Sequence, residues 1–261
     1  MRKHFSTFML CVLFIFFTAC SQQSGGESRS DIATEASQIS ASVPEIQEKI
    51  ISFGDKLLEE KIRHEIGKLE GGITLDEASA VTSLNLSNEN FDDMNTKGGG
   101  IKDINALRYF TGLIELTLAF NNISDLNPLS GLTKLETLDI SGTQVEDLSS
   151  LKDMKSIKCL ISCWLQSENG PKGIGSLDAL TGLKNLEMID AKNAGITDVS
   201  ALANLPRLWE VQLNDNEITD VTSLARVVNL KVLLLEGNPI TDYSPLKNIY
   251  PQLEGKDFTI N

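Results

Sequence analysis

The sequence predicts an α/β solenoid, a curved horseshoe with a parallel sheet on its concave side and irregular or 3₁₀ segments on its convex side. An apolar frame recurs at intervals of 22 residues from about residue 81 onward. Each copy begins with alternating apolar residues, which indicates a short strand with one buried face. Each copy ends with apolar residues at every third position, which suits a tight 3₁₀-like turn. No copy can bury its own apolar face, so the copies must stack.

Seven copies of this frame are predicted between residues 81 and 251. One complete copy begins at Leu113, and others begin at Leu135, Leu186, Leu208 and Leu230. The copies that begin at Val81 and Ile157 are longer, because they carry insertions at 88–100 and 164–173. Both insertions fall between the strand and the convex segment, so they can wall one side of a groove. Drift in tolerant loops is the alternative explanation.

Polar residues at fixed positions of the frame have defined roles. Asn121, Asn216 and Asn238 follow their strands, where a side-chain amide can satisfy backbone groups as the chain turns away. Thr143 and Ala194 interrupt this Asn ladder. The Asp of each Ile-x-Asp or Val-x-Asp step can accept hydrogen bonds from free amides of the convex turn.

The two ends of the repeat array are predicted to be capped. Residues 44–80 form an N-terminal helical cap, in which Asp55 begins a helix, Gly67 ends it, and Thr74 with Glu77 has the spacing of a capping box. Such helices would cover the apolar edge of the first repeat. Residues 252–261 are predicted to form a C-terminal edge-strand segment, in which residues 258–260 supply the strand itself.

The repeat frame resembles the 22-residue internalin-type leucine-rich repeat of bacterial surface proteins. The resemblance covers roughly residues 81–251, and the segment from Phe53 to Thr74 resembles the N-terminal cap of the same proteins. It implies an adhesion or recognition module that grips a protein partner. Repeat folds serve many roles, so an envelope scaffold that holds another protein of the same cell is a second hypothesis.

The N-terminus has the pattern of an export signal. Arg2 and Lys3 precede an apolar run at 5–17 that is short for a membrane span. The run ends in Phe-Thr-Ala-Cys20, which resembles the lipobox of bacterial lipoproteins, although Phe17 replaces the usual Leu. We therefore expect a signal peptide at 1–19 and lipidation of Cys20. An ordinary cleaved signal peptide that releases a soluble protein is the alternative.

A polar, Ser-rich stretch at 20–43 is predicted to be a flexible linker. The order of anchor, linker and domain predicts an exported, membrane-anchored protein at the outer membrane or cell surface. No wall-anchoring tail follows the last repeat, so we expect Cys20 to provide the anchor.

The charge balance narrows the possible partners. The chain has 23 basic and 36 acidic residues, and removal of residues 1–19 takes Arg2 and Lys3 with it, which gives a formal charge of −15. This balance opposes binding to nucleic acid, and it limits membrane contact to the anchor at Cys20. It fits either simple solubility or a basic partner. We expect a monomer.

Side chains that flank the buried positions of each strand are predicted to face outward from the concave sheet. Apolar side chains there predict a stripe on an otherwise acidic face, and such clusters commonly anchor protein interfaces. The alternative is that Trp164 and Trp209 pack over the rim. The predicted partner-binding residues are Phe120, Asp139, Ile161, Trp164, Met188, Asp190, Trp209, Glu210 and Gln212.

Nothing in the sequence indicates catalysis, a cofactor or a metal site. His64, on the predicted cap helix, is the one histidine after residue 19, and no zinc or nucleophile pattern accompanies it. Acidic residues at 89–95 lack the spacing of an EF-hand calcium site. Cys159 and Cys163 lie four residues apart on one strand, about 13 Å, which is too far for a disulfide, so both are predicted to be free.

Overall fold

The computed structural model describes residues 49–88, 100–165 and 173–260. They fall within one compact unit, residues 47–261, and the structural statements below concern the described residues alone. The predicted signal peptide, Cys20, the linker and the central parts of both insertions lie outside them.

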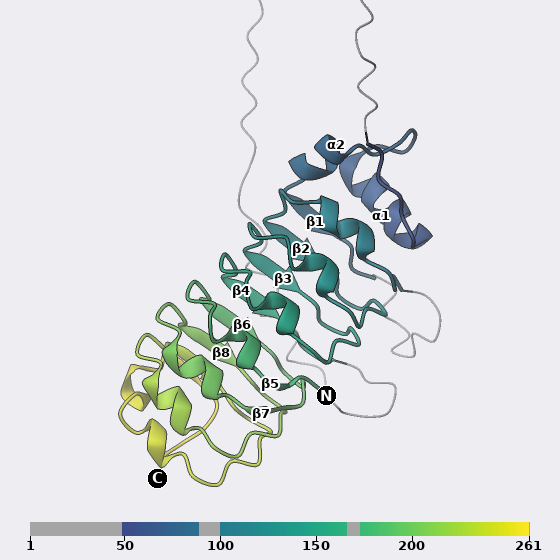
Figure 1. Ribbon diagram of the computed structural model, residues 1–261. Coiled ribbons are helices and arrows are strands. Elements are labelled where there is room, and N and C mark those ends of the chain that lie inside the picture. The colour runs from purple at the N-terminus through teal and green to yellow at the C-terminus, as the bar shows by residue number, and fades with distance from the viewer. Residues whose placement is uncertain (1–48, 89–99, 166–172, 261) are drawn as a thin grey trace, which may run out of the picture. The chain divides into compact units, whose positions relative to one another are not determined.

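A parallel eight-stranded sheet forms one side of the unit (Figure 1). Between uninterrupted copies the register pairs residues 22 apart, as in Glu115 opposite Thr137. In this sheet, the central residue of each three-residue strand points inward and is buried. The strands in spatial order are β1 (Ser83–Asn85), β2 (Glu115–Thr117), β3 (Thr137–Asp139), β4 (Cys159–Ile161), β6 (Met188–Asp190), β8 (Glu210–Gln212), β9 (Val232–Leu234) and β10 (Gly255–Lys256).

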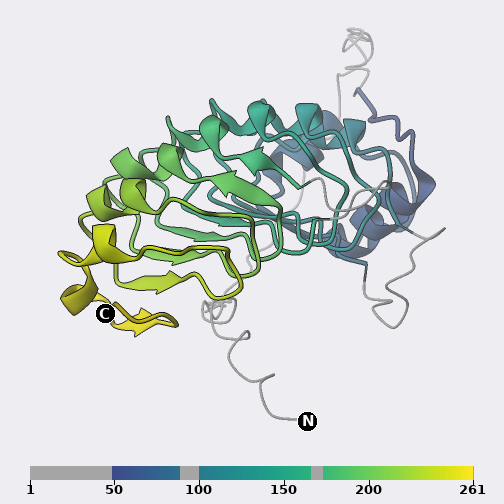
Figure 2. The same ribbon diagram turned by 90° about the horizontal axis from the view of Figure 1, so that it is seen from below.

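Short 3₁₀ helices form the opposite, convex side, and Figure 2 shows them aligned along one side with the strands along the other. The predicted solenoid with a parallel sheet and 3₁₀ turns is therefore confirmed. A separate two-stranded sheet pairs β5 (Gly175–Ser176) with β7 (Ile196–Asp198). The 3₁₀ helices are η1 (Asn105–Tyr109), η2 (Asn127–Leu129), η3 (Ser149–Leu151), η4 (Asp178–Leu180), η5 (Ser200–Asn204), η6 (Thr222–Arg226), η7 (Ser244–Leu246) and η8 (Tyr250–Gln252).

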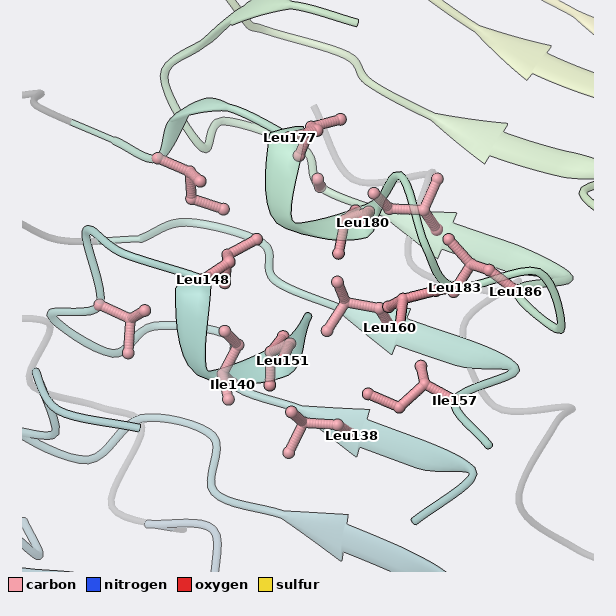
Figure 3. Close-up of a cluster of buried hydrophobic side chains, with 14 of the residues drawn as sticks. Leu138, Ile140, Leu148, Leu151, Ile157, Leu160, Leu177, Leu180, Leu183 and Leu186 are labelled. Carbon is pink, nitrogen blue, oxygen red and sulfur yellow. The ribbon is translucent and has the colours of Figure 1, made fainter. Parts of the chain in front are cut away.

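The core is a continuous column of aliphatic side chains between the sheet and the 3₁₀ helices. Figure 3 shows Leu138 and Leu160 of the strands facing Leu151 and Leu180 of the convex turns. Each of these four side chains is fully buried. Because each coil supplies only part of the surrounding side chains, burial depends on the neighbouring coils.

Acidic side chains begin the convex turns as predicted. Within the described residues, each of six aspartates accepts a hydrogen bond from the amide two residues later, at 2.7–2.8 Å. These residues are Asp103, Asp125, Asp147, Asp198, Asp220 and Asp242. In the remaining copy, the Ser176 hydroxyl accepts from the Asp178 amide at 3.1 Å.

Buried asparagines close the turn after the strands. The Asn216 Oδ1 accepts from the amides of Ala194 and Ile196, and its Nδ2 donates to the carbonyls of Ala191 and Leu213. Asn121 bonds in the same manner to the preceding copy. Each buried amide therefore satisfies backbone groups of two coils at once.

The N-terminal cap contains the predicted helices, α1 (Lys56–Ile66) and α2 (Leu75–Ala80). Gly67 ends α1 in the left-handed conformation, and Thr74 with Glu77 forms the capping box of α2. One carboxylate oxygen of Asp55 accepts from two amides of α1, and the other accepts from the amides of Lys102 and Asp103. Burial raises the pKa of Asp55, but these four amides outweigh that effect and lower it. Asp55 thus joins the cap to the first repeat.

The C-terminal end differs in detail from the prediction. Its edge strand is Gly255–Lys256, so the prediction that residues 258–260 form this strand was wrong. Phe258 is buried instead, and its ring stacks on Tyr243 with centroids 4.8 Å apart. Residues 258–260 do not pair as a strand, because burial of the Phe258 ring against the last coil stabilises the chain more than further hydrogen bonds at the sheet edge would. No helix in the described part of the chain is long and apolar enough to cross a membrane.

Candidate functional site

The outward surface of the eight-stranded sheet, here called the concave face, carries two rows of side chains. The first strand residues give one row, in which Cys159, Met188 and Glu210 are adjacent. The third strand residues give the other row, in which Asp139, Ile161, Asp190 and Gln212 are adjacent. The strand register therefore brings together six of the nine predicted binding residues, the exceptions being Phe120, Trp164 and Trp209.

The centre of the second row is an isoleucine between two carboxylates. Ile161 is half-buried, Asp139 lies beside it on β3, and Asp190 lies beside it on β6. Burial raises the pKa of Asp139, and the amide and hydroxyl of Ser141 offset this only in part. Burial also raises the pKa of Asp190, which is only 2% exposed, despite bonds from Cys163 and Lys192. Both carboxylates are therefore held in surroundings that disfavour their charge.

Cys159 and Cys163, the cysteines of the described residues, are not joined in a disulfide. Cys163 is buried, and its Sγ donates to Asp190 Oδ1 at 2.9 Å. Burial, followed by the negative charge of Asp190, raises the pKa of the Cys163 thiol. Cys163 is therefore an uncharged donor that positions Asp190, and it lacks the thiolate form needed of a nucleophile.

The rim at the end of the strands is built from residues with positive φ. Gly142 and Gly237 occupy this position in two copies, where a left-handed conformation carries no Cβ penalty. Phe120 (φ 60°) and Trp164 (φ 51°) occupy it in two others. A bulky residue in this conformation costs roughly 1–2 kcal/mol. Phe120 and Trp164 both adopt this unfavourable conformation on the same rim, which makes the rim a candidate functional feature.

The predicted apolar stripe is divided between the two rims. Trp164 lies four residues after the strand position of Leu160, whereas Trp209 lies one residue before β8. Trp164 and Trp209 therefore stand six positions apart in the repeat, which corresponds to about 20 Å along the strand direction at roughly 3.3 Å per residue. Both indoles are partly exposed, Trp164 at 39% and Trp209 at 41%. Phe120 shares the rim of Trp164, and its ring lies against Gly142, where a Cβ would clash with it.

Sequence reasoning missed the Cys163–Asp190 contact and the positive-φ rim. A signal for the rim was present, because Gly142, Asn193, Asp215 and Gly237 occupy one frame position and are residue types that tolerate a left-handed backbone. Among the described residues, no group of three or more His, Cys, Asp or Glu side chains is placed to hold a metal ion.

Comparison with known proteins identifies the repeat. Residues 111–153 match the family model described as leucine rich repeats (2 copies), so the chain contains leucine-rich repeats. No curated protein sequence gives a significant match.

Solved structures of Listeria monocytogenes internalins share the fold. An internalin (inlF) is 26% identical with a TM-score of 0.60, over 80% of this chain and 64% of its own. Internalin C2 is 28% identical with a TM-score of 0.59, over 79% of this chain and 94% of its own. This chain thus spans less than two thirds of the first structure and nearly all of the second. The functional domain of InlJ, at 22% identity and a TM-score of 0.50, shows the same fold over 74% of this chain and 48% of its own.

The raised pKa of Asp139 predicts a pH-dependent effect of Asp139→Asn. A carboxyl whose pKa is higher in the folded state binds its proton more tightly there, so its ionisation destabilises the fold as pH rises above the unfolded pKa of about 3.9. Asp139→Asn removes this penalty and should raise the free energy of unfolding at pH 7 by about 1 kcal/mol. The gain should vanish below about pH 4, as measured by urea denaturation at both pH values.

Asp147→Asn is the matched control. The hydroxyl and the amide of Ser149 lower the pKa of Asp147, so its ionised form stabilises the fold above the unfolded pKa. Its replacement should therefore lower stability at neutral pH, and this loss should disappear in acid. Equal effects of Asp139→Asn at both pH values would contradict the assigned burial of Asp139.

Proposed function

We propose that this chain is a surface-displayed lipoprotein that binds a protein partner through its concave face, as an adhesion or recognition module. The leucine-rich-repeat fold supports a binding role, and the similarity to internalins favours recognition of another cell's protein. We propose no catalytic activity, cofactor or metal. The proposed binding residues are Phe120, Asp139, Ile161, Trp164, Met188, Asp190, Trp209, Glu210 and Gln212.

The observation that carries this proposal is the central row of Asp139, Ile161 and Asp190. Neighbouring strands lie about 4.8 Å apart, so the two aspartates flank the isoleucine within roughly 10 Å. Both carboxylates are desolvated, which disfavours their charge in the free domain. A cationic group of the partner that contacts the half-buried Asp139 would compensate that charge, with the negative charge of the buried Asp190 adding to the attraction.

The composition of the face indicates the chemistry of the partner. The cations beside the centre of the two rows are already paired: Lys192 lies 3.6 Å from Asp215, and Lys158, just before β4, lies 2.7 Å from Glu136. Asp139 and Glu210 are half-buried and present carboxylates to the face, whereas Asp190 is buried beneath it. We therefore propose a partner segment that places a lysine or arginine beside an apolar side chain over Ile161.

Ile161→Arg tests this site most sharply. The new guanidinium would occupy the space between Asp139 and Asp190 and would pair with them in place of the partner. In a pull-down with the full chain as bait, the captured partner should be lost. Ser124→Arg is the control, because it adds the same side chain at an exposed position away from the sheet.

The source of the captured protein decides between two roles. Extracts of the producing cell and of candidate host cells are tested in parallel, and circular dichroism confirms that both variants fold. A partner from host cells supports recognition, whereas a partner from the producing cell supports an envelope scaffold. Capture that survives Ile161→Arg would show that the central row is not the binding site.

Membrane anchoring at Cys20 is a separate part of the proposal. It is supported by the basic residues, apolar run and lipobox-like sequence at 1–20. Cells fed with labelled palmitate should incorporate label into the native chain and not into Cys20→Ser. Equal labelling of both proteins, or label in neither, would contradict lipidation at this residue.

A further inference from the structure

The loops that lead from each 3₁₀ helix to the next strand carry an excess of cations. Between residues 130 and 254, the segments between a 3₁₀ helix and the next strand hold four acidic residues, Glu136, Asp153, Glu187 and Glu254. The same segments hold eight cations: Lys134, Lys152, Lys155, Lys158, Lys184, Arg207, Lys231 and Lys247. Five exposed cations of these segments and Arg226, the last residue of η6, define what we call the basic flank: Lys134, Lys152, Lys184, Arg207, Arg226 and Lys247.

The charges of the basic flank are not neutralised within the described part of the chain. Lys155, in the same loops, pairs with Asp153 at 3.8 Å, and the six cations of the flank form no ion pair there. The loops on the other side of the sheet carry the turn-capping aspartates, such as Asp147 and Asp220. The strongly acidic net charge therefore conceals a separation of charge between two flanks.

Exposed apolar side chains lie on this same flank. Val228, in the segment between η6 and β9, is 70% exposed, and Tyr109, the last residue of η1, is 41% exposed. Asn229 donates to the Pro206 carbonyl at 2.6 Å, which brings the Val228 loop against the loop of Arg207. Trp209 lies where this flank meets the concave face. Cations combined with exposed aromatic and aliphatic side chains are typical of surfaces that lie in a lipid headgroup layer.

We propose that the basic flank rests on anionic lipid headgroups, in addition to any contact made by the N-terminal anchor. Each cation close to an anionic bilayer raises membrane partitioning roughly fivefold, so six act strongly together. The acidic loops lie about 20 Å away across the strands, beyond a screening length of about 8 Å, so their repulsion is weak at physiological salt.

A second copy of the chain fits this flank less well. Basic and acidic loops lie on opposite flanks of one molecule, so pairing them between copies is a head-to-tail contact that leaves one flank of each kind open. A planar anionic surface instead meets all six cations at once. In this orientation the concave face, which adjoins the flank, stays open to a partner.

Vesicle binding tests the proposal. The full chain carries Cys20→Ser in every sample, which removes any acyl chain, and the probes are phosphatidylcholine vesicles with and without phosphatidylglycerol. The anionic vesicles should bind the protein at least about tenfold more tightly than the neutral ones. The triple variant Lys134→Glu, Arg207→Glu, Arg226→Glu should lose at least about tenfold of that affinity.

A control variant carries the same change of charge elsewhere. Lys49→Glu, Lys56→Glu, Lys102→Glu alters exposed side chains on and beside the cap, and it should bind anionic vesicles like the parent. Equal binding by both triple variants, or equal binding to neutral vesicles, would overturn the proposal. Self-association is measured in solution without vesicles. If the native chain associates with rising concentration and the flank variant does not, the flank binds a second copy of the chain, and the membrane proposal is overturned.

Discussion

The structure depends on one constraint: no coil of the chain can satisfy its own buried surface. Each coil exposes an apolar edge on both sides, and only the neighbouring coils cover it. Backbone groups at the turn after the strand face the same problem. The buried amides of Asn121 and Asn216 and the half-buried amide of Asn238 solve it by bonding to two coils at once. Leucine burial makes stacking favourable, and the asparagines fix the turn geometry that stacking requires.

This regular stacking converts positions in the frame into surfaces. Because the strands are in register, one frame position from each copy forms a continuous row, and its chemistry is decided one residue at a time. The third strand position gives Asp139, Ile161 and Asp190 on the concave face. Positions between each 3₁₀ helix and the next strand give the cations of the basic flank. Two surfaces of different composition thus arise from one repeat without disturbing the core.

The repeat itself was predictable from the sequence, because its positions have strict periodic requirements. The Leu-x-Leu alternation, the Asp caps and the cap helix that begins at Asp55 were all confirmed. The last strand was misplaced, because Phe258 alternates like a strand residue although its ring packs on Tyr243.

The candidate site was less predictable than the fold. The strands are only three residues long, so the alternation that places Ile161 on the face no longer applies to Trp164 and Trp209, which lie on opposite rims. The left-handed backbone at Phe120 and Trp164 is set by the turn and not by their residue type. The contact of Cys163 with Asp190 joins residues of different copies, and the charge of the flanks is hidden in the summed net charge.

The most direct test of this account measures the free energy of unfolding of Asn216→Ala in urea, with Asn122→Ala as the control. Asn122 is half-exposed, and its side chain makes no hydrogen bond among the described residues, so its loss should change stability by less than about 0.5 kcal/mol. Asn216→Ala leaves buried amides and carbonyls of two coils without partners and should cost at least about 2 kcal/mol. Equal, small losses in both variants would show that apolar stacking alone holds the coils, and would contradict the role given to the buried amides.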